Sequence, residues 1–403
     1  MAANEMSFNQ VATILNAIQS QVTGQAALTA TNTADFVTNA TTVLKTGYDP
    51  VMNAINQVLS RTIFSVRPYN RKFGGMEISE AQWGNHVRKL TVCDKPIADD
   101  DRYTWPVGYD ATGHPSNPIG DGESVDQQII NKASVLQTNL YGANVYSDSY
   151  TVYRDQLDVA FRGVEELGQF VSMYVQNITD KLEQYREGIA RMTVANFIGG
   201  IIDEDSSDRV VKLLTEYNAA TGLSLTATSV YQPANFRPFM QWAYARIAAI
   251  TSLMTERSEM YQTQISGKTV NRHTPLSDQR VYLYAPAMYQ TEMMALADTY
   301  HENYMRLADN EAVNFWQSIR TPDAINLTAG RVDSTGAVVS GAVEQGNIFG
   351  VISDREAMGY ATINGWSAPA PFNARGGYTT VWIHETERNY NDHTEKGVVL
   401  LLE

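Results

Sequence analysis

Hydrophobic positions near the N-terminus recur with the spacing of an α-helix. Two series fall within residues 8–22 and 36–44, and a third begins at Asp49, a suitable N-cap, with Pro50 at the first helical position. The opposite faces are mostly Asn, Gln and Thr, so these helices need an apolar surface to lie on. The pattern predicts a helical N-terminal arm. Its apolar positions are Phe8, Val11, Ile14, Leu15, Ile18 and Val22, then Phe36, Ala40, Val43 and Leu44, then Val51, Ile55, Val58 and Leu59.

The longest helical pattern runs from about residue 156 to residue 202. Gly163 and Gly168 could split this helix, and Gly199 with Gly200 forms a natural stop. Its apolar stripe contains Phe161, Val164, Leu167, Phe170, Val171, Tyr174, Ile178, Leu182, Tyr185, Ile189, Met192 and Phe197.

The central region alternates turns, helices and a strand. Proline, glycine and β-branched residues mark the boundaries. In chain order we predict an acidic surface turn at 203–208, a loop at 221–235, a helix from Pro238 to about 261, a buried strand at 280–284 and a helix starting near Met288.

Two strand-like runs, 379–383 and 398–402, close the chain around a polar turn at 389–397. They predict a closing hairpin in a mixed sheet, and an end this apolar must be buried. Further strands are predicted at 62–67, 86–93, 348–352 and 360–363. The mixture of strands and helices makes the fold class α+β or α/β.

Composition narrows the class of protein. The chain has 403 residues and 43% hydrophobic content, enough for two or more folded units. The start of the chain lacks the pattern of a signal peptide, and no apolar run is long enough to span a membrane. A single cysteine, Cys93, excludes an intramolecular disulfide and suits a reducing cytoplasm. The net charge of -14 argues against a dedicated nucleic-acid binder, although loose contact with DNA stays open.

Residues 64–122 are polar, rich in proline and locally basic within an acidic chain. A long segment of this kind is either a mobile loop or is ordered by another subunit. A basic segment on an acidic body favours contacts between identical subunits, and its aromatic residues suit interface anchors, although stacking on bases or sugars and a randomly charged loop are alternatives. The candidate interface residues are Arg67, Arg71, Lys72, Trp83, Arg88, Lys89, Arg102 and Trp105.

No common catalytic or nucleotide-binding motif is present in the sequence. His384, Glu385, Asp392 and His393 are ligand types that could meet across the closing hairpin, but no known metal-site spacing matches, so polar decoration of a strand and turn is favoured. Cys93 lies seven positions after His86 in a predicted strand, and this odd separation puts the two side chains on opposite faces, which favours a buried or unreactive thiol. We therefore predict no catalytic, cofactor-binding or metal-binding residue.

Two stretches carry a family resemblance. The segment from Trp382 through His384, Glu385 and Arg388 to Lys396, and the central stretch TGLSLTATSVYQPANFRPFMQWAYARIAAITSLMTERSEMY, resemble major capsid proteins of tailed phages with the Hong Kong 97 fold, of the gut-phage type. The resemblance implies an α+β fold with an N-terminal arm (1–63), an extended E-loop hairpin (64–124), a peripheral domain with a long spine helix (125–204), an axial domain (205–374) and a C-terminal return to the peripheral domain (375–403).

The resemblance also implies a function. Copies would assemble as hexamers and pentamers into an icosahedral head that encloses double-stranded DNA, touched without sequence preference. The partners would be the chain itself and possible scaffolding, portal and decoration proteins, with no cofactor, enzyme activity or membrane. Assembly would occur in the bacterial host cytoplasm, and the chain would reside in the virion capsid. We expect the N-terminal arm to be retained, without maturation cleavage.

Two alternatives remain open from the sequence. An encapsulin-like compartment has the same fold and encloses protein cargo. A soluble hydrolase would be a monomer or small oligomer that depends on His384 or His393. Gly74, Gly75, Gly376 and Gly377 are candidate hinges, and ordinary turns explain them as well.

Overall fold

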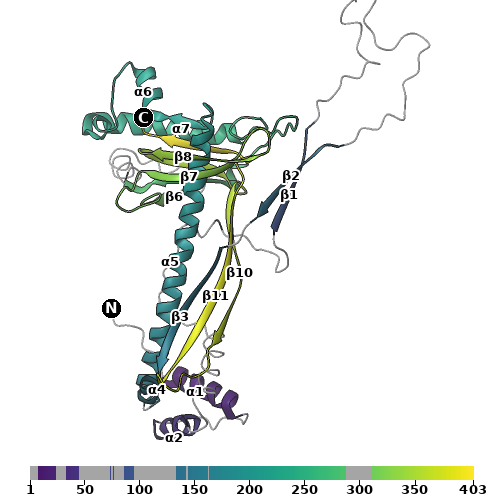
Figure 1. The fold of residues 1–403 in the computed structure, drawn as a ribbon. Coiled ribbons are helices and arrows are strands. Elements are labelled where there is room, and N and C mark those ends of the chain that lie inside the picture. The colour runs from purple at the N-terminus through teal and green to yellow at the C-terminus, as the bar shows by residue number, and fades with distance from the viewer. Residues whose placement is uncertain are drawn as a thin grey trace, which may run out of the picture. The chain divides into compact units, whose positions relative to one another are not determined.

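The computed structural model describes residues 8–23, 33–44, 73, 76, 86–94, 133–141, 144–161, 163–286 and 310–403 (Figure 1). The chain divides into two compact units, each assembled from separate chain segments. The first is Met1–Asn85, Tyr141–Asn196 and Met358–Asn391, and the second is His86–Leu140, Phe197–Ala357 and Asp392–Glu403. None of the described helices is both long and apolar enough to cross a membrane.

The first unit combines helices with a three-stranded antiparallel sheet in the order β10-β11-β3. Val381 of β11 is buried while its neighbour Trp382 is exposed, the alternation expected of a strand with one covered face. The strands run alongside the long helix α5 (Figure 1), and Tyr146 of β3 packs against Tyr185 of α5 at 4.2 Å between ring centroids. The elements are α1 (Phe8–Thr23), α2 (Thr33–Leu44), α4 (Arg154–Ala160), most of α5 (Val164–Glu204), β3 (Asn144–Tyr153), β10 (Met358–Pro369) and β11 (Tyr378–Asn391).

The helical periodicity of the sequence is confirmed for α1 and α2, whose apolar positions Leu15, Ile18, Phe36 and Val43 are buried. The third predicted arm helix lies outside the described residues, as does the strand predicted at 62–67. The break expected at Gly163 is confirmed between α4 and α5, whereas the helix continues through Gly168.

The predicted stop at Gly199 and Gly200 is wrong, because α5 continues through both glycines to Glu204. Their role is close packing. A Cβ on Gly199 would lie 2.9 Å from the Cβ of Ala329, and one on Gly200 would lie 2.2 Å from Nε2 of His393. Here glycine admits tertiary neighbours rather than ending the helix.

The second unit centres on a five-stranded mixed sheet in the order β4-β12-β9-β5-β6. β12 is parallel to β4 and β5 is parallel to β6, whereas β9 runs antiparallel to both of its neighbours. The strands are β4 (Val210–Lys212), β5 (Gln279–Tyr284), β6 (Asn310–Val313), β9 (Ile348–Asp354) and β12 (Gly397–Leu401).

The core of this unit forms where two helices meet that sheet. It is built from buried side chains including Phe236, Phe239, Ile247, Ile250 and Met254 of α7, with Val281 and Leu283 of β5 and Val398 and Leu400 of β12. The remaining elements are α6 (Leu213–Thr221), α7 (Pro233–Met254), the ribbon of β1 (His86–Val92) with β2 (Val135–Tyr141), the ribbon of β7 (Ile325–Val332) with β8 (Val338–Gln345), and 3-10 turns at Ser229–Tyr231 and Leu276–Asp278.

Helix α7 differs from its predicted bounds. It begins at Pro233, inside the predicted loop, because Gln232 takes the N-cap position and Pro233 is tolerated in the first turn. Pro238 lies within the helix rather than at its start. The helix ends at Met254, and Tyr261 has a φ of +69° that a continuing helix does not allow.

The predicted closing hairpin is also wrong. β11 lies between β10 and β3 in the first unit, whereas β12 lies between β4 and β9 in the second, so both edges of each strand are already paired with other partners. The buried apolar end and the mixed sheet are confirmed, since every residue of β12 is buried. The strands predicted at 86–93, 280–284, 348–352 and 360–363 are confirmed as β1, β5, β9 and β10. The helix predicted near Met288 lies outside the described residues.

Gly377 has a φ of +67°, in a turn closed by the hydrogen bond from its N–H to the Asn373 carbonyl at 2.8 Å. The turn explains that glycine, and a hinge role for Gly376 and Gly377 stays a prediction. Gly74 and Gly75 lie outside the described residues. The boundary between the two compact units falls after Asn391, within the predicted C-terminal region 375–403. The five predicted domains stay a prediction.

Candidate functional site

The polar turn at residues 392–396, which we call the 392–396 turn, is where the structure departs most from the sequence prediction. Polar decoration of a surface turn was favoured, but all five residues are buried. Burying charged groups is costly unless each is paired. The turn is therefore a candidate functional element, and its partners define it.

Two hydrogen bonds within the turn fix its shape. Oδ1 of Asp392 accepts from the Thr394 N–H at 3.0 Å and from the Thr394 hydroxyl at 2.5 Å, the arrangement of an Asx turn. Nζ of Lys396 donates to the Glu256 carbonyl at 2.9 Å and to Oγ of Ser258 at 3.0 Å. Burial lowers the pKa of Lys396.

Glu395 lies between two cations from distant parts of the second unit. Its Oε1 is contacted by Nη1 of Arg272 and by Nζ of Lys89, which belongs to β1. Lys89 Nζ also lies 3.3 Å from Oδ2 of Asp392 and 3.0 Å from Oε2 of Glu356. Burial favours the neutral amine, but the carboxylates of Asp392 and Glu395 outweigh it and raise the pKa of Lys89. Lys89 is therefore a fixed positive charge inside a cluster of carboxylates.

Arg209 is a fully buried cation in the turn between α5 and β4. Its Nη1 contacts Oε2 of Glu204 and donates to the Thr263 hydroxyl at 2.6 Å, and its Nε donates to the Gly397 carbonyl at 3.1 Å. Burial lowers the pKa of Arg209, and Glu204 opposes this effect.

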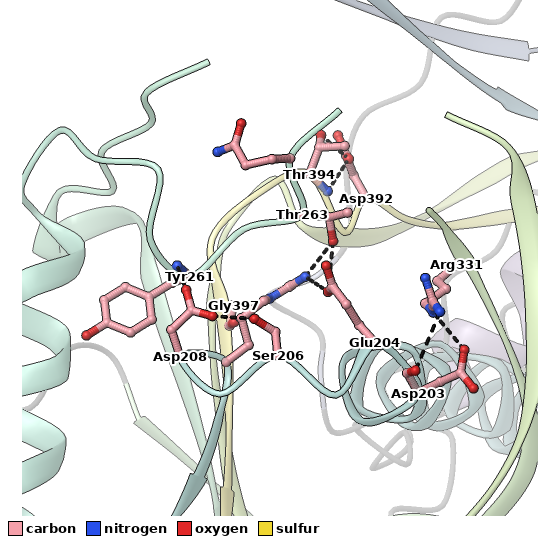
Figure 2. Close-up of polar contacts among 12 residues, drawn as sticks. Asp203, Glu204, Ser206, Asp208, Tyr261, Thr263, Arg331, Asp392, Thr394 and Gly397 are labelled. Atoms are coloured by element: carbon pink, nitrogen blue, oxygen red, sulfur yellow. Dashed lines mark hydrogen bonds and ion pairs between the residues drawn. The ribbon is translucent and has the colours of Figure 1, made fainter. Parts of the chain in front are cut away.

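Figure 2 shows the carboxylates at this end of α5 turned toward separate partners. Asp203 forms an ion pair with Nε of Arg331 on β7 at 2.6 Å, and Glu204 also accepts from the Thr263 hydroxyl at 2.9 Å. Asp208 accepts from the Tyr261 N–H at 2.9 Å. The predicted acidic surface turn at 203–208 is thus largely engaged in internal contacts, which lock the helix end in place.

His393 is buried against α5. Its ring stacks on Phe197 at 5.1 Å between centroids with an interplanar angle of 23°, directly over Gly200. Burial and the neighbouring Arg209 lower the pKa of His393 to about 3. The imidazole is neutral at neutral pH, and it fills space rather than titrating there.

Stability of the isolated chain should fall in mild acid because of His393. With a folded pKa of about 3 and an ordinary unfolded value near 6.5, only the unfolded state gains a proton between these limits, so stability is full above about pH 6.5 and declines as pH falls toward 3. At pH 5 the loss from this residue is roughly 2 kcal/mol. Urea unfolding of His393→Gln at pH 5 and pH 7.5 should show a smaller difference than wild type. The control is His273→Gln, at an exposed histidine, which should show the wild-type difference in stability between pH 5 and pH 7.5. The same pH difference in both variants would contradict the assignment to His393.

The first unit has its own polar cluster between α5 and the sheet. Arg186 of α5 contacts Glu183 at 2.7 Å, Glu385 at 2.8 Å and Glu387 at 3.0 Å, and the Tyr146 hydroxyl donates to Glu385 at 2.7 Å. Burial and the hydrogen bond to Glu385 raise the pKa of Tyr146. These contacts hold β3 and β11 against the helix.

The four residues considered as metal ligands are divided between the two compact units. His384 and Glu385 belong to β11 in the first unit, and Asp392 and His393 belong to the second. Within the described part of the chain, no group of three potential ligands is placed to hold a metal ion. Cys93 is buried, as predicted.

Of the eight predicted interface residues, the described residues include Arg88 and Lys89, and the other six lie outside them. Side chains alternate along β1: Arg88, Leu90 and Val92 are exposed, the last two by 57% and 65%, whereas Lys89 and Cys93 point inward. Lys89 forms its ion pairs within its own chain, whereas Arg88 is exposed to solvent. A subunit interface at these residues stays a prediction.

The fold resembles that of solved phage structures. No protein-family model and no curated protein matches the sequence. A chain in the capsid structure of Staphylococcus phage Andhra aligns with a TM-score of 0.50 and 12% identity, covering 85% of this chain and 87% of that one. A chain in the structure of the head fiber and inner core protein gp22 of native bacteriophage P68 aligns with a TM-score of 0.51 and 10% identity over the same shares. At these identities the likeness shows the fold, and it confirms the mixed helix and sheet architecture of the Hong Kong 97 type.

Proposed function

We propose that this chain is the major capsid protein of a tailed phage, a structural subunit without enzyme activity. The observation that carries the proposal is the fold, which matches a chain in a phage capsid structure over 85% of this chain. Copies would form hexamers and pentamers that close into an icosahedral head around double-stranded DNA. The acidic chain, with a net charge of -14, would let DNA pack against the wall without tight binding.

The chemistry of the described polar clusters supports a structural role. Their carboxylates are matched by cations or by hydrogen-bond donors, as in Arg209 with Glu204 and Arg186 with Glu385. Such clusters favour one specific packing rather than a reaction. Scaffolding, portal and decoration proteins are possible partners, and the subunit would assemble in the host cytoplasm and remain in the virion.

We further propose the named regions of the capsid fold for this chain. The arm would be 1–63, the E-loop 64–124 with β1 in it, the peripheral domain 125–204 with α5 as spine helix, and the axial domain 205–374, followed by the C-terminal return at 375–403. The proposed subunit interface comprises Arg67, Arg71, Lys72, Trp83, Arg88, Arg102 and Trp105, with Lys89 beside them as an internal anchor.

The exposed face of β1 offers a test of self-assembly. Leu90 is a large apolar residue open to solvent in the isolated chain, as expected of a side chain that a second copy covers. Leu90→Asp should abolish assembly into large particles while leaving the subunit folded, because it would bury an unpaired charge at the contact. Leu90→Met, which keeps the apolar volume, should assemble like wild type.

Light scattering and circular dichroism of the two variants measure particle size and folding together. If Leu90→Asp assembled normally, the exposed face of β1 would not be a subunit contact.

The content of particles isolated from the natural host distinguishes the two kinds of shell. Particles that enclose protein rather than DNA would favour a protein compartment over a phage head.

A further inference from the structure

Several polar contacts attach the ribbon of β1 and β2 to its own unit. Of the β1 strand and the two residues that follow it, only Cys93 is buried among the described side chains. The exposed face carries Leu90 and Val92, so it adds no packing within the chain. The contacts of the inner face therefore decide how firmly the ribbon is held.

Lys89 makes the central contact. It is the cation that β1 supplies to Glu395, Asp392 and Glu356, and its side chain is 21% exposed. Arg272 also contacts Glu395, and the charge of Arg209 acts on Asp392 without an ion-pair contact. Removing the Lys89 charge leaves Arg272 on Glu395 but, among the described residues, no cation in ion-pair contact with Asp392, although both carboxylates are almost completely buried. Repulsion among carboxylates and their desolvation would then oppose docking of the strand.

A second set of contacts holds the end of β1. The Asp94 N–H donates to the Thr269 carbonyl at 2.8 Å, and Oδ2 of Asp94 accepts from the Asn271 N–H at 2.7 Å. On the neighbouring strand segment, Nζ of Lys268 donates to Oγ of Ser134 at 2.7 Å. These bonds join the ribbon to the loop that follows α7, which also supplies Arg272.

We propose that Lys89 and the 392–396 turn form an ionic clamp that fixes the direction of the β1–β2 ribbon and can open without unfolding the unit. The turn is itself anchored to α5 through His393 and Gly200. Ion pairs hold the ribbon to the turn, and the His393 ring holds the turn to the helix end. Opening the ion pairs uncovers one buried side chain among residues 88–94, that of Cys93. This inference concerns the single chain and does not rest on the proposed capsid function. In a shell, it would let identical copies hold the ribbon at different angles.

The only cysteine of the chain gives a direct readout. Cys93 shares the inner face of β1 with Lys89, so its thiol should react with a disulfide reagent only when the ribbon root opens. In the full-length unassembled chain, Lys89→Met should raise the labelling rate at least tenfold, equivalent to about 1.4 kcal/mol of clamp stability. The neighbouring Arg88→Met, on the exposed face, should label at the wild-type rate.

The urea dependence of labelling separates clamp opening from unfolding. Local opening exposes little surface, so the Lys89→Met rate should depend only weakly on urea. Two results would overturn the proposal. One is a Cys93 labelling rate in Lys89→Met equal to that of the wild type, and the other is a raised rate with the full urea dependence of global unfolding. Lys89→Arg, which keeps the charge, should restore slow labelling. Particle formation is measured separately, so a chain with an intact clamp that never assembles would count against the capsid function alone.

Discussion

Gly200→Ala should destabilise the second unit by about 3 kcal/mol or more, the upper part of the range for overpacking a core. The added Cβ would lie 2.2 Å from Nε2 and 2.8 Å from Cε1 of His393. The imidazole is stacked on Phe197 and buried, so the ring cannot swing away as the tip of a flexible side chain would. Either α5 or the 392–396 turn must shift. Thermal or urea unfolding of the purified chain measures the loss.

Gly188→Ala is the matched control in the same helix. Apart from the adjacent residues and the backbone of α5 itself, no atom of the described residues lies within 4 Å of the Cβ position of Gly188. Alanine there should stabilise the chain by roughly 0.5–1 kcal/mol through helix propensity. The double variant Gly200→Ala, His393→Ala should recover part of the stability lost in Gly200→Ala, because it removes the ring that the methyl group meets. Equal stabilities for the two single glycine variants would show that the close approach is not a constraint.

Arg209→Met should cost about 3–5 kcal/mol, the range for removing one partner of a buried ion pair. Methionine preserves most of the side-chain volume but leaves Glu204, the Thr263 hydroxyl and the Gly397 carbonyl without the guanidinium. The measurement is the urea midpoint of the purified chain at neutral pH.

Two further variants isolate the buried charge. Lys212→Met removes an exposed ion pair with Glu403 at 3.5 Å and should change stability by no more than about 0.5 kcal/mol. Arg209→Met combined with Glu204→Gln should be more stable than Arg209→Met alone, since the uncompensated carboxylate is gone. A stable Arg209→Met protein would mean that water or another group replaces the guanidinium at no cost.

Periodicity made the helices readable from the sequence. The apolar stripes of α1 and α2 are regular, and their residues Leu15, Ile18, Phe36 and Val43 are buried. The stripe of α5 is confirmed only in part: Ile189 and Phe197 are buried, whereas Tyr185 and Met192 are exposed by 46% and 68%. Strand β3 was missed although its alternating sequence NVYSDSYTVY carries the signal, whereas the three residues of β4 are too short to be recognised.

The failures at Gly199, Gly200 and the closing hairpin have one cause. A pair of glycines is compatible both with the end of a helix and with the close approach of another segment. Here Ala329 and His393 approach Gly199 and Gly200, and the helix continues. Likewise, strand, turn and strand describe both a hairpin and two strands in different sheets. The tertiary partners, distant in sequence, select the outcome.

The polar site could be predicted only in part. The residue types in the 392–396 turn were noticed, but their burial was not, because the cations Lys89, Arg209 and Arg272 are far from the turn in the sequence. A run of five polar residues followed directly by a fully apolar strand was the available signal. Arg209 itself carries no local signal in the sequence, since it follows a short turn of acidic and serine residues.

Electron microscopy of the purified, recombinantly expressed chain tests the central claim most directly. The account predicts closed shells or rings of five and six subunits, with the long helix and its three-stranded sheet recognisable in each subunit of a reconstruction. A folded chain that stays monomeric under all assembly conditions, including expression together with the other head proteins of its own phage, would contradict the capsid function.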